Sequence, residues 1–224
     1  MPPRAVRVAT IAIASVTISF TRAGAQAIAP ADSQATCSLS VVKAASCAPM
    51  TLQEKAAFYT DRTVSARTFL GTGFAAGVAQ WKKTPSEWGS GLSGYERRYA
   101  AAFGGGFVRH TAEFGVGAWL HEDPRFEPST HDGFAARGAD ALHNTVFVRT
   151  DDGGHRLAWS RVVASIATGF AVNSWEPRRL HGTHHALVLS LAGMASYATG
   201  NLTREFTPDV KRYLFRKLHI HNRM

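Results

Sequence analysis

Cysteine is scarce in this chain: only Cys37 and Cys47 occur among 224 residues, which excludes a disulfide-stabilised scaffold or a cysteine-rich zinc module. Long hydrophobic runs are missing too. The apolar stretch Ala186–Ala195 is typical, and its length of about ten residues suits a buried helix better than a bilayer span, which needs about 20. These absences favour a soluble or peripheral protein, and an integral membrane protein is the alternative.

Common catalytic motifs are absent as well. The chain has no Gly-x-Ser-x-Gly motif, the usual mark of a nucleophile-elbow hydrolase. It has no Gly-x-x-x-x-Gly-Lys-Ser/Thr loop, so no residue is assigned to a nucleotide or another cofactor. Its basic residues are spread along the chain, and we expect no nucleic-acid partner.

The composition that remains is that of a folded protein. Hydrophobic residues make up 45% of the chain and charged residues 18%, which excludes a disordered chain. The formal net charge is +9. A positive excess of this kind favours association with acidic surfaces such as anionic lipid.

The first 25 residues have the order of a secretory signal peptide. Arg4 and Arg7 precede the apolar stretch Val8–Phe20, and small residues follow before a cleavage point near Gln26. A retained anchor is the alternative, but an apolar stretch of about 13 residues is too short to span a bilayer. We therefore expect an exported protein of the periplasm or cell envelope.

Residues 26–50 are rich in Ala, Ser and Pro, and we expect them to form a flexible linker. Both cysteines lie in this segment, ten positions apart. In an oxidising compartment Cys37 and Cys47 can form a local disulfide. Free thiols are the alternative.

The rest of the chain predicts an all-α protein, a compact bundle of five or six helices in a single domain, residues 51–224. A capping box of Thr51 and Glu54 marks the first helix start, and Pro85, Pro124 and Pro177 mark helix ends. No segment alternates with the period of a strand. The expected helices comprise residues 51–81, 92–121, 133–149, 157–175 and 183–205, and a short basic tail helix that starts at Pro208.

Small residues recur along these helices at or near four-residue spacing. An interior glycine costs about 1 kcal/mol relative to alanine in a helix, so the number of glycines indicates a compensating gain from close helix approach. The faces expected to pack in this way contain Gly73 and Gly77, Gly104–Gly106, Gly115 and Gly117, Gly169, and Ala192, Ser196 and Gly200.

The most unusual polar cluster is the segment His121-Glu122-Asp123-Pro124-Arg125. One interpretation is an acid and base site in which His121 exchanges a proton near neutral pH. The other is a helix end held by an ion-pair network, in which Arg125 binds one of the acids through two nitrogens. A catalytic site between the second and third helices would also use His110, Glu113 and His143, although His110 also fits an ordinary core histidine.

Pairs of metal-binding side chains occur at two places. Asp140 and His143 are three residues apart and share a helix face, and facing helices can build a metal site from such pairs. His181 and His185 share a face at four-residue spacing, but the glutamate of the metalloprotease His-Glu-x-x-His motif is missing. Structural or exposed histidines are the alternative at both places.

Several short motifs between residues 55 and 215 resemble a group of uncharacterised predicted secreted bacterial proteins. The resemblance implies a helical exported protein and assigns no catalytic residue or cofactor. Its motifs are Glu87-Trp88-Gly89-x-Gly91, Gly94-Tyr95-x-x-Arg98, Glu113-x-Gly115-x-Gly117, Leu120-His121-Glu122-Asp123-Pro124-Arg125, Ala158-Trp159-Ser160-Arg161, Asn173-x-Trp175-x-Pro177 and Arg204-Glu205-Phe206-x-Pro208-Asp209.

These features favour a non-enzymatic envelope protein that associates with a membrane or with a partner protein. The basic tail Lys211–Arg223 could contact anionic head groups, and an exposed helix face is the alternative for that tail. The competing hypothesis is a periplasmic enzyme, such as a metal-dependent hydrolase, with its histidines and carboxylates between helices.

Overall fold

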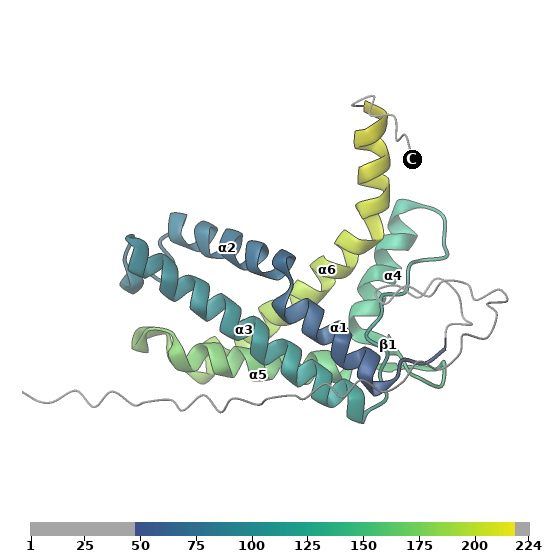
Figure 1. Ribbon diagram of the computed structural model, residues 1–224, viewed down its shortest axis with the longest axis horizontal. Coiled ribbons are helices and arrows are strands. Elements are labelled where there is room, and N and C mark those ends of the chain that lie inside the picture. Colours follow the sequence, from purple (N-terminus) through teal and green to yellow (C-terminus); the bar gives the residue numbers. More distant parts are fainter. Residues whose placement is uncertain (1–47, 218–224) are drawn as a thin grey trace, which may run out of the picture. The chain divides into compact units, whose positions relative to one another are not determined.

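The computed structural model describes residues 48–217, which all belong to one compact unit spanning residues 35–224. The signal peptide predicted for residues 1–25 and the disulfide predicted between Cys37 and Cys47 lie outside the described residues. The all-α prediction is confirmed. The helices are α1 (Leu52–Val64), α2 (Ala66–Trp81), α3 (Leu92–Trp119), α4 (Phe134–Val146), α5 (Trp159–Trp175) and α6 (Thr183–Lys217), with short 3-10 turns at Ser86–Trp88 and Arg178–Leu180 (Figure 1).

The start of the first helix agrees with the sequence, but its end does not. The backbone amide of Thr51 donates to Glu54 Oε2 at 2.8 Å and that of Glu54 donates to Thr51 Oγ1 at 3.3 Å, which confirms the capping box. The prediction of one helix over residues 51–81 is wrong. Ser65 adopts an extended conformation and its hydroxyl accepts the amide of Thr68, so that it ends α1 and caps α2.

The prediction that no strand occurs is also wrong. Strands β1 (Phe147–Arg149) and β2 (His155–Leu157) pair antiparallel, with Val148 opposite Arg156. The expected third helix therefore ends at Val146 instead of Arg149. Each strand is only three residues long, too short for an alternating pattern to stand out in the sequence.

Helix α3 contacts α1, α2 and α5, and α6 contacts both α5 and α4 (Figure 1). Helices α5 and α6 approach each other closely: a Cβ at Gly169 would come within 2.5 Å of the Ala186 carbonyl oxygen. The small-residue prediction is thus partly confirmed. Glycines with a neighbouring helix or turn within 4 Å of a Cβ include Gly73, Gly104, Gly105, Gly117 and Gly169. No atom of the described part of the chain lies within 4 Å of the same position at Gly77, Gly106, Gly115 and Gly200.

The expected division of the last helix does not occur, because α6 continues through Pro208. Proline lacks the amide that would bond to the Arg204 carbonyl, and its ring crowds the preceding turn, which bends a helix. Figure 1 shows the change of direction along α6. The predicted basic tail helix is therefore the last part of α6.

The interior of the bundle is unusually polar. Among the described residues, buried polar and charged side chains outnumber buried hydrophobic ones, and several of the latter are alanines. Buried charged groups are expensive unless they are paired and hydrogen-bonded. The packing therefore depends on specific polar contacts, several of which come from the residues singled out in the sequence.

Candidate functional site

The carboxylate of Glu122 lies at the amino end of α5. It accepts hydrogen bonds from the backbone amides of Trp159 (3.1 Å) and Ser160 (3.3 Å), and from the Ser160 hydroxyl. Ala158, at the capping position itself, has no side chain that could do this. A negative charge at this place is stabilised by the helix dipole, so Glu122 acts as the helix cap from a distant segment.

Asp123 and Arg125 form a buried ion pair. Arg125 Nε lies 2.9 Å from Asp123 Oδ1 and Arg125 Nη2 lies 2.5 Å from Asp123 Oδ2, a two-pronged contact. Nη2 also donates to the carbonyl of Ala48. The structural interpretation of this segment, an ion-paired helix end, is thereby confirmed.

His121 has a different environment from its neighbours. Its side chain is 80% exposed, and its Nδ1 lies 3.6 Å from Asp151 Oδ2. The same carboxylate oxygen accepts a 2.7 Å hydrogen bond from the buried Lys55 ammonium. His121 and Glu122 thus contact different groups although they are adjacent in sequence.

Glu113 is held inside the bundle by Tyr197 and Arg62. The Tyr197 hydroxyl donates to Glu113 Oε2 at 2.8 Å, and Arg62 Nη1 lies 3.5 Å from Oε1. Burial, together with the neighbouring Glu113 carboxylate, raises the pKa of Tyr197 well above its usual value. The tyrosine therefore stays protonated and acts as the donor.

His110 is one helical turn away from Glu113 but makes a separate contact, with 3.0 Å between its Nδ1 and the hydroxyl oxygen of Thr63. Burial, with the nearby positive charge of Arg62, lowers the pKa of His110 to about 4. His110 is therefore neutral at pH 7, as expected for a core histidine.

The candidate metal ligands have other partners. Asp140 Oδ2 binds the hydroxyl of Ser129 and His131 Nδ1, while the ring of His143 stacks on Phe147 with 4.6 Å between centroids. Glu176 accepts from both members of the other pair, through its carbonyl from His181 Nε2 and through Oε2 from His185 Nε2. Within residues 48–217, no group of three or more His, Cys, Asp or Glu side chains is arranged to hold a metal.

The residues predicted for an enzyme site therefore lie in separate places. His110 lines one pocket, Glu113 another and Arg125 a third. Most of their polar atoms are engaged in contacts that join helices. This arrangement offers strong structural contacts and no evident acid and base pair around a shared cavity.

One buried residue, Arg98, was named in the sequence only as part of a short motif and was given no role there. The Arg98 guanidinium donates to the carbonyl oxygens of Thr84, Pro85 and Gly89 and to the side chain of Gln80, and so holds the connection between α2 and α3. The four-residue spacing of Gly94 and Arg98 was a usable signal. A Cβ at Gly94 would come within 2.5 Å of the Trp88 carbonyl, so this turn needs both residues.

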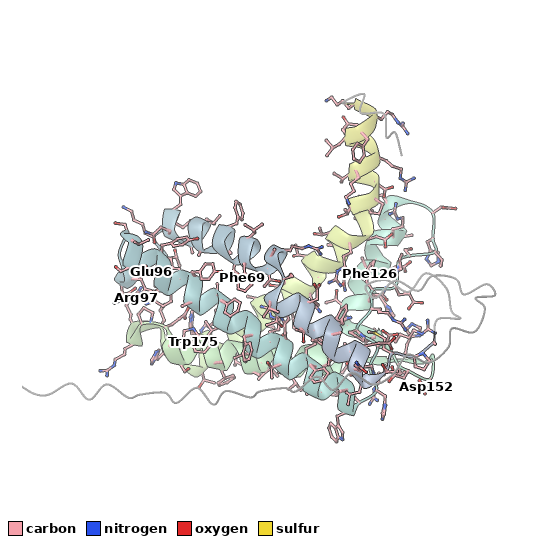
Figure 2. All side chains as sticks on the ribbon, in the orientation of Figure 1. Phe69, Glu96, Arg97, Phe126, Asp152 and Trp175 are labelled. Carbon is pink, nitrogen blue, oxygen red and sulfur yellow. The ribbon has the colours of Figure 1, made fainter. Side chains whose placement is uncertain are left out.

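The outer side of α2 is apolar. No charged residue occurs between Arg67 and Lys82, and the exposed fractions are 76% for Leu70, 76% for Phe74 and 82% for Trp81. The opposite side packs on α3, where Phe69 stacks on a phenylalanine ring of that helix (Figure 2). A helix that is hydrophobic all round is normally buried, but residues 48–217 cover α2 on one side only.

Helices α5 and α6 repeat this pattern. The segments 162–175 and 186–203 contain no charged residue. Along α5 the exposed side chains form a stripe at spacings of four, three and four residues, namely Trp159, Val163, Ile166 and Phe170. In the charge-free segment of α6 the exposed large apolar residues are Leu187, Val188 and Leu191. In the part of the chain that the structure describes, no helix is both long enough and apolar enough to cross a membrane.

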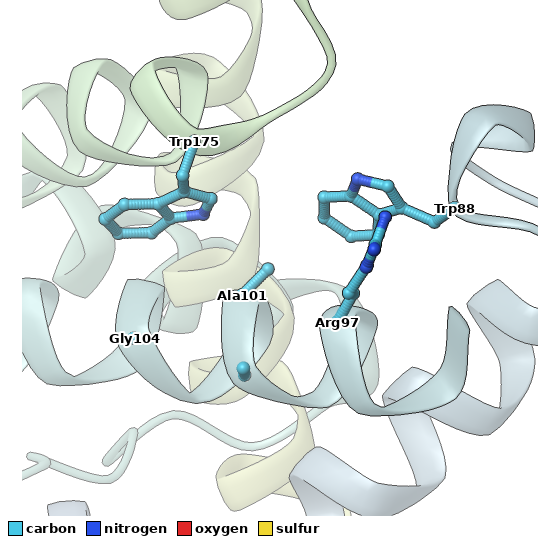
Figure 3. A pocket seen from close by; sticks show the side chains of 6 residues that line it. Trp88, Arg97, Ala101, Gly104 and Trp175 are labelled. Atoms are coloured by element: carbon cyan, nitrogen blue, oxygen red, sulfur yellow. The ribbon is translucent and has the colours of Figure 1, made fainter. Parts of the chain in front are cut away.

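Two tryptophans at the ends of α5 and of the first 3-10 turn face a pocket on α3. The pocket has a volume of about 510 Å³ and lies between Trp88 and Trp175, with Arg97 at its side (Figure 3). Its floor is made of small residues, Ala100, Ala101 and Gly104. We call it the tryptophan pocket, and its apolar walls and single cation suit an apolar group with a negative end.

Comparison with family models, with curated proteins and with solved structures finds no match to this chain. The resemblance to secreted bacterial proteins stays a prediction.

Proposed function

We propose that the protein is a non-enzymatic, exported envelope protein that attaches to a lipid membrane surface through apolar helix faces. The observation that carries the proposal is the outer side of α2, where Leu70, Phe74 and Trp81 are almost fully exposed. Burying a side chain of this size stabilises by about 1.5–3 kcal/mol. Burying these three side chains in lipid would therefore support a substantial affinity for the membrane.

Charge supports lipid as the covering material. Arg67 precedes the charge-free segment of α2, and Lys82 and Lys83 follow it directly after Trp81. Tryptophan favours the boundary between head groups and acyl chains, and each lysine or arginine near an anionic surface adds about 1 kcal/mol. A helix with this order of residues fits a position in the membrane interface.

The polar interior supports the non-enzymatic part of the proposal. Glu122 caps α5, and Asp123 pairs with Arg125. These contacts give structural roles to Glu122, Asp123 and Arg125, three of the residues that first suggested catalysis. Substitutions that remove these contacts should therefore lower the free energy of unfolding.

Vesicle flotation tests the proposal. The purified chain is mixed with vesicles of phosphatidylcholine containing phosphatidylglycerol, and the bound fraction is measured at low salt and at high salt. We expect binding that persists at high salt, because burial of apolar surface is not screened. The double variant Leu70→Gln with Phe74→Gln should bind at least about tenfold more weakly.

The matched control is Leu52→Gln, which changes a leucine that is 63% exposed on α1, outside the apolar face of α2. It should bind like the original chain, with circular dichroism confirming that all variants are folded. Equal binding by the double variant and the control would contradict the proposal. A chain that does not bind vesicles but forms a defined oligomer would also contradict the proposal, because a second copy would then cover α2.

A further inference from the structure

A second pocket, separate from the tryptophan pocket, is lined by an unusual number of arginines. Its walls come from α1, α3, α5 and α6, and it encloses about 60 Å³. We call it the arginine pocket. Its arginines are Arg62, Arg109, Arg161 and Arg204.

The arginine pocket has an excess of positive charge. Among residues 48–217, Glu113 is the single acidic residue that lines it, and it already contacts Arg62 and the Tyr197 hydroxyl. Arg161 is buried and donates to the carbonyls of Asn144 and Thr145, which are uncharged. One carboxylate therefore faces four guanidinium groups.

Arg109 and Arg204 have hydrogen-bond donors without an acceptor among the described residues. Arg109 Nε is buried and has no hydrogen-bond acceptor among the described residues. The guanidinium of Arg109 lies over the Tyr197 ring, 5.7 Å from its centroid, which balances its charge only in part. Arg204 makes no hydrogen bond or ion pair within residues 48–217. A buried donor without an acceptor is costly and is usually satisfied by a water, an ion or a ligand.

The lowered pKa values of two neighbouring groups agree with this excess of arginines over carboxylates. Partial burial, and then the neighbouring Arg62 and Arg161, lower the pKa of Arg204 to about 10. Arg62 and Arg109 also contribute to the low pKa of His110. Both groups therefore experience the same excess of positive charge.

We propose that the arginine pocket binds one small oxyanion group, a phosphate or phosphate monoester, between Arg62, Arg109 and Arg204. The volume suits one such group, and guanidinium groups bind the oxygens of phosphate through two parallel hydrogen bonds. The phosphate can be free or can belong to the head group of a lipid. The inference does not depend on membrane attachment, because the arginine pocket contains no residue of α2.

Isothermal titration calorimetry with inorganic phosphate tests the proposal on the full chain in a neutral detergent, at constant ionic strength set with chloride. We expect saturable binding of one phosphate per chain. Arg204→Gln should weaken it about tenfold or more, as expected for loss of one charge-assisted contact, and Arg109→Gln should do the same. Although protein atoms surround its guanidinium closely enough to lower its pKa, the side chain of Arg204 reaches solvent at the surface of α6, so its replacement should leave the fold intact.

The matched control is Arg216→Gln, which removes the same charge from an exposed position of the same helix, outside the arginine pocket. It should bind phosphate like the original chain. Equal affinities for Arg204→Gln and Arg216→Gln would overturn the proposal. A titration with phosphate that releases no more heat than a titration with chloride would overturn it as well. A parallel titration with a short-chain phosphatidic acid identifies the source: tighter binding than inorganic phosphate assigns a lipid head group, and equal or weaker binding assigns free phosphate.

Discussion

The hydroxyl of Tyr197, in the middle of α6, donates a 2.8 Å hydrogen bond to the buried carboxylate of Glu113 on α3. This contact joins two helices that are far apart in the sequence. It also fixes the position of Glu113, the only acidic group among the described residues that line the arginine pocket.

Replacement of Tyr197 by phenylalanine should destabilise the protein. Glu113 would keep Arg62 as a partner but lose its hydroxyl donor, and an unsatisfied buried group costs about 1–3 kcal/mol. Denaturant unfolding measures the difference. Tyr213→Phe, at an exposed position of the same helix, is the control and should change the free energy of unfolding little.

Gly169→Ala should push α5 and α6 apart. The new Cβ would come within 2.5 Å of the Ala186 carbonyl and 2.7 Å of the Ser190 amide nitrogen, backbone atoms that cannot move away cheaply. Overpacking of this kind costs about 1–3 kcal/mol. Gly106→Ala, on α3 with nothing within 4 Å, should instead stabilise the helix by about 0.5–1 kcal/mol. Thermal unfolding of the two variants should therefore shift in opposite directions, and a shared direction would contradict the packing described above.

Removal of the carboxylate of Glu122 should weaken the start of α5. Glu122→Ala leaves the amides of Trp159 and Ser160 without this acceptor, at a cost of about 1–2 kcal/mol. Hydrogen exchange of the Trp159 and Ser160 amides should become faster. Glu127→Ala removes an exposed carboxylate that contacts His155, and protection at the same two amides should be unchanged.

The protein should be less stable in mild acid because the folded chain disfavours protonation of His110. Its pKa is about 4 in the folded protein and about 6.5 in an unfolded chain, so the unfolded chain binds more protons between these values. The free energy of unfolding should therefore fall as the pH decreases through this window, by about 1–2 kcal/mol between pH 7.5 and pH 5.

His110→Gln keeps a polar side chain but cannot take up a proton. Its free energy of unfolding should fall less than that of the original chain over the same pH range. A His155→Gln control changes an exposed histidine and should retain the full dependence. If His110→Gln and the original chain show parallel curves, the pKa of His110 is not lowered by folding.

The helices were largely predictable because glycine, proline and capping residues mark their ends. The helix break at Ser65 was missed because no glycine or proline stands near it, and its capping contact with Thr68 is visible only in the folded chain. The strands were missed because they are short. In both cases the local secondary structure depends on contacts with distant parts of the chain.

The site was harder to predict than the fold. Glu122 and Ser160 are separated by 38 residues, so no local spacing reveals that one caps the helix of the other. The four arginines of the arginine pocket come from four helices. Arg161 and Arg204 stand in two of the short motifs named above, but no spacing in the sequence brings them together with Arg62 and Arg109. The apolar outer side of α2 escaped notice because a helix that is apolar on every side gives no stripe.

The exposed side of α2 also determines what a stability measurement on this chain means. An amphiphile that binds the folded state and not the unfolded one shifts the equilibrium by mass action. Leu70 and Phe74 are available for such binding in the folded chain. Samples in two detergents are therefore two different thermodynamic systems, and a melting temperature belongs to the protein and its amphiphile together.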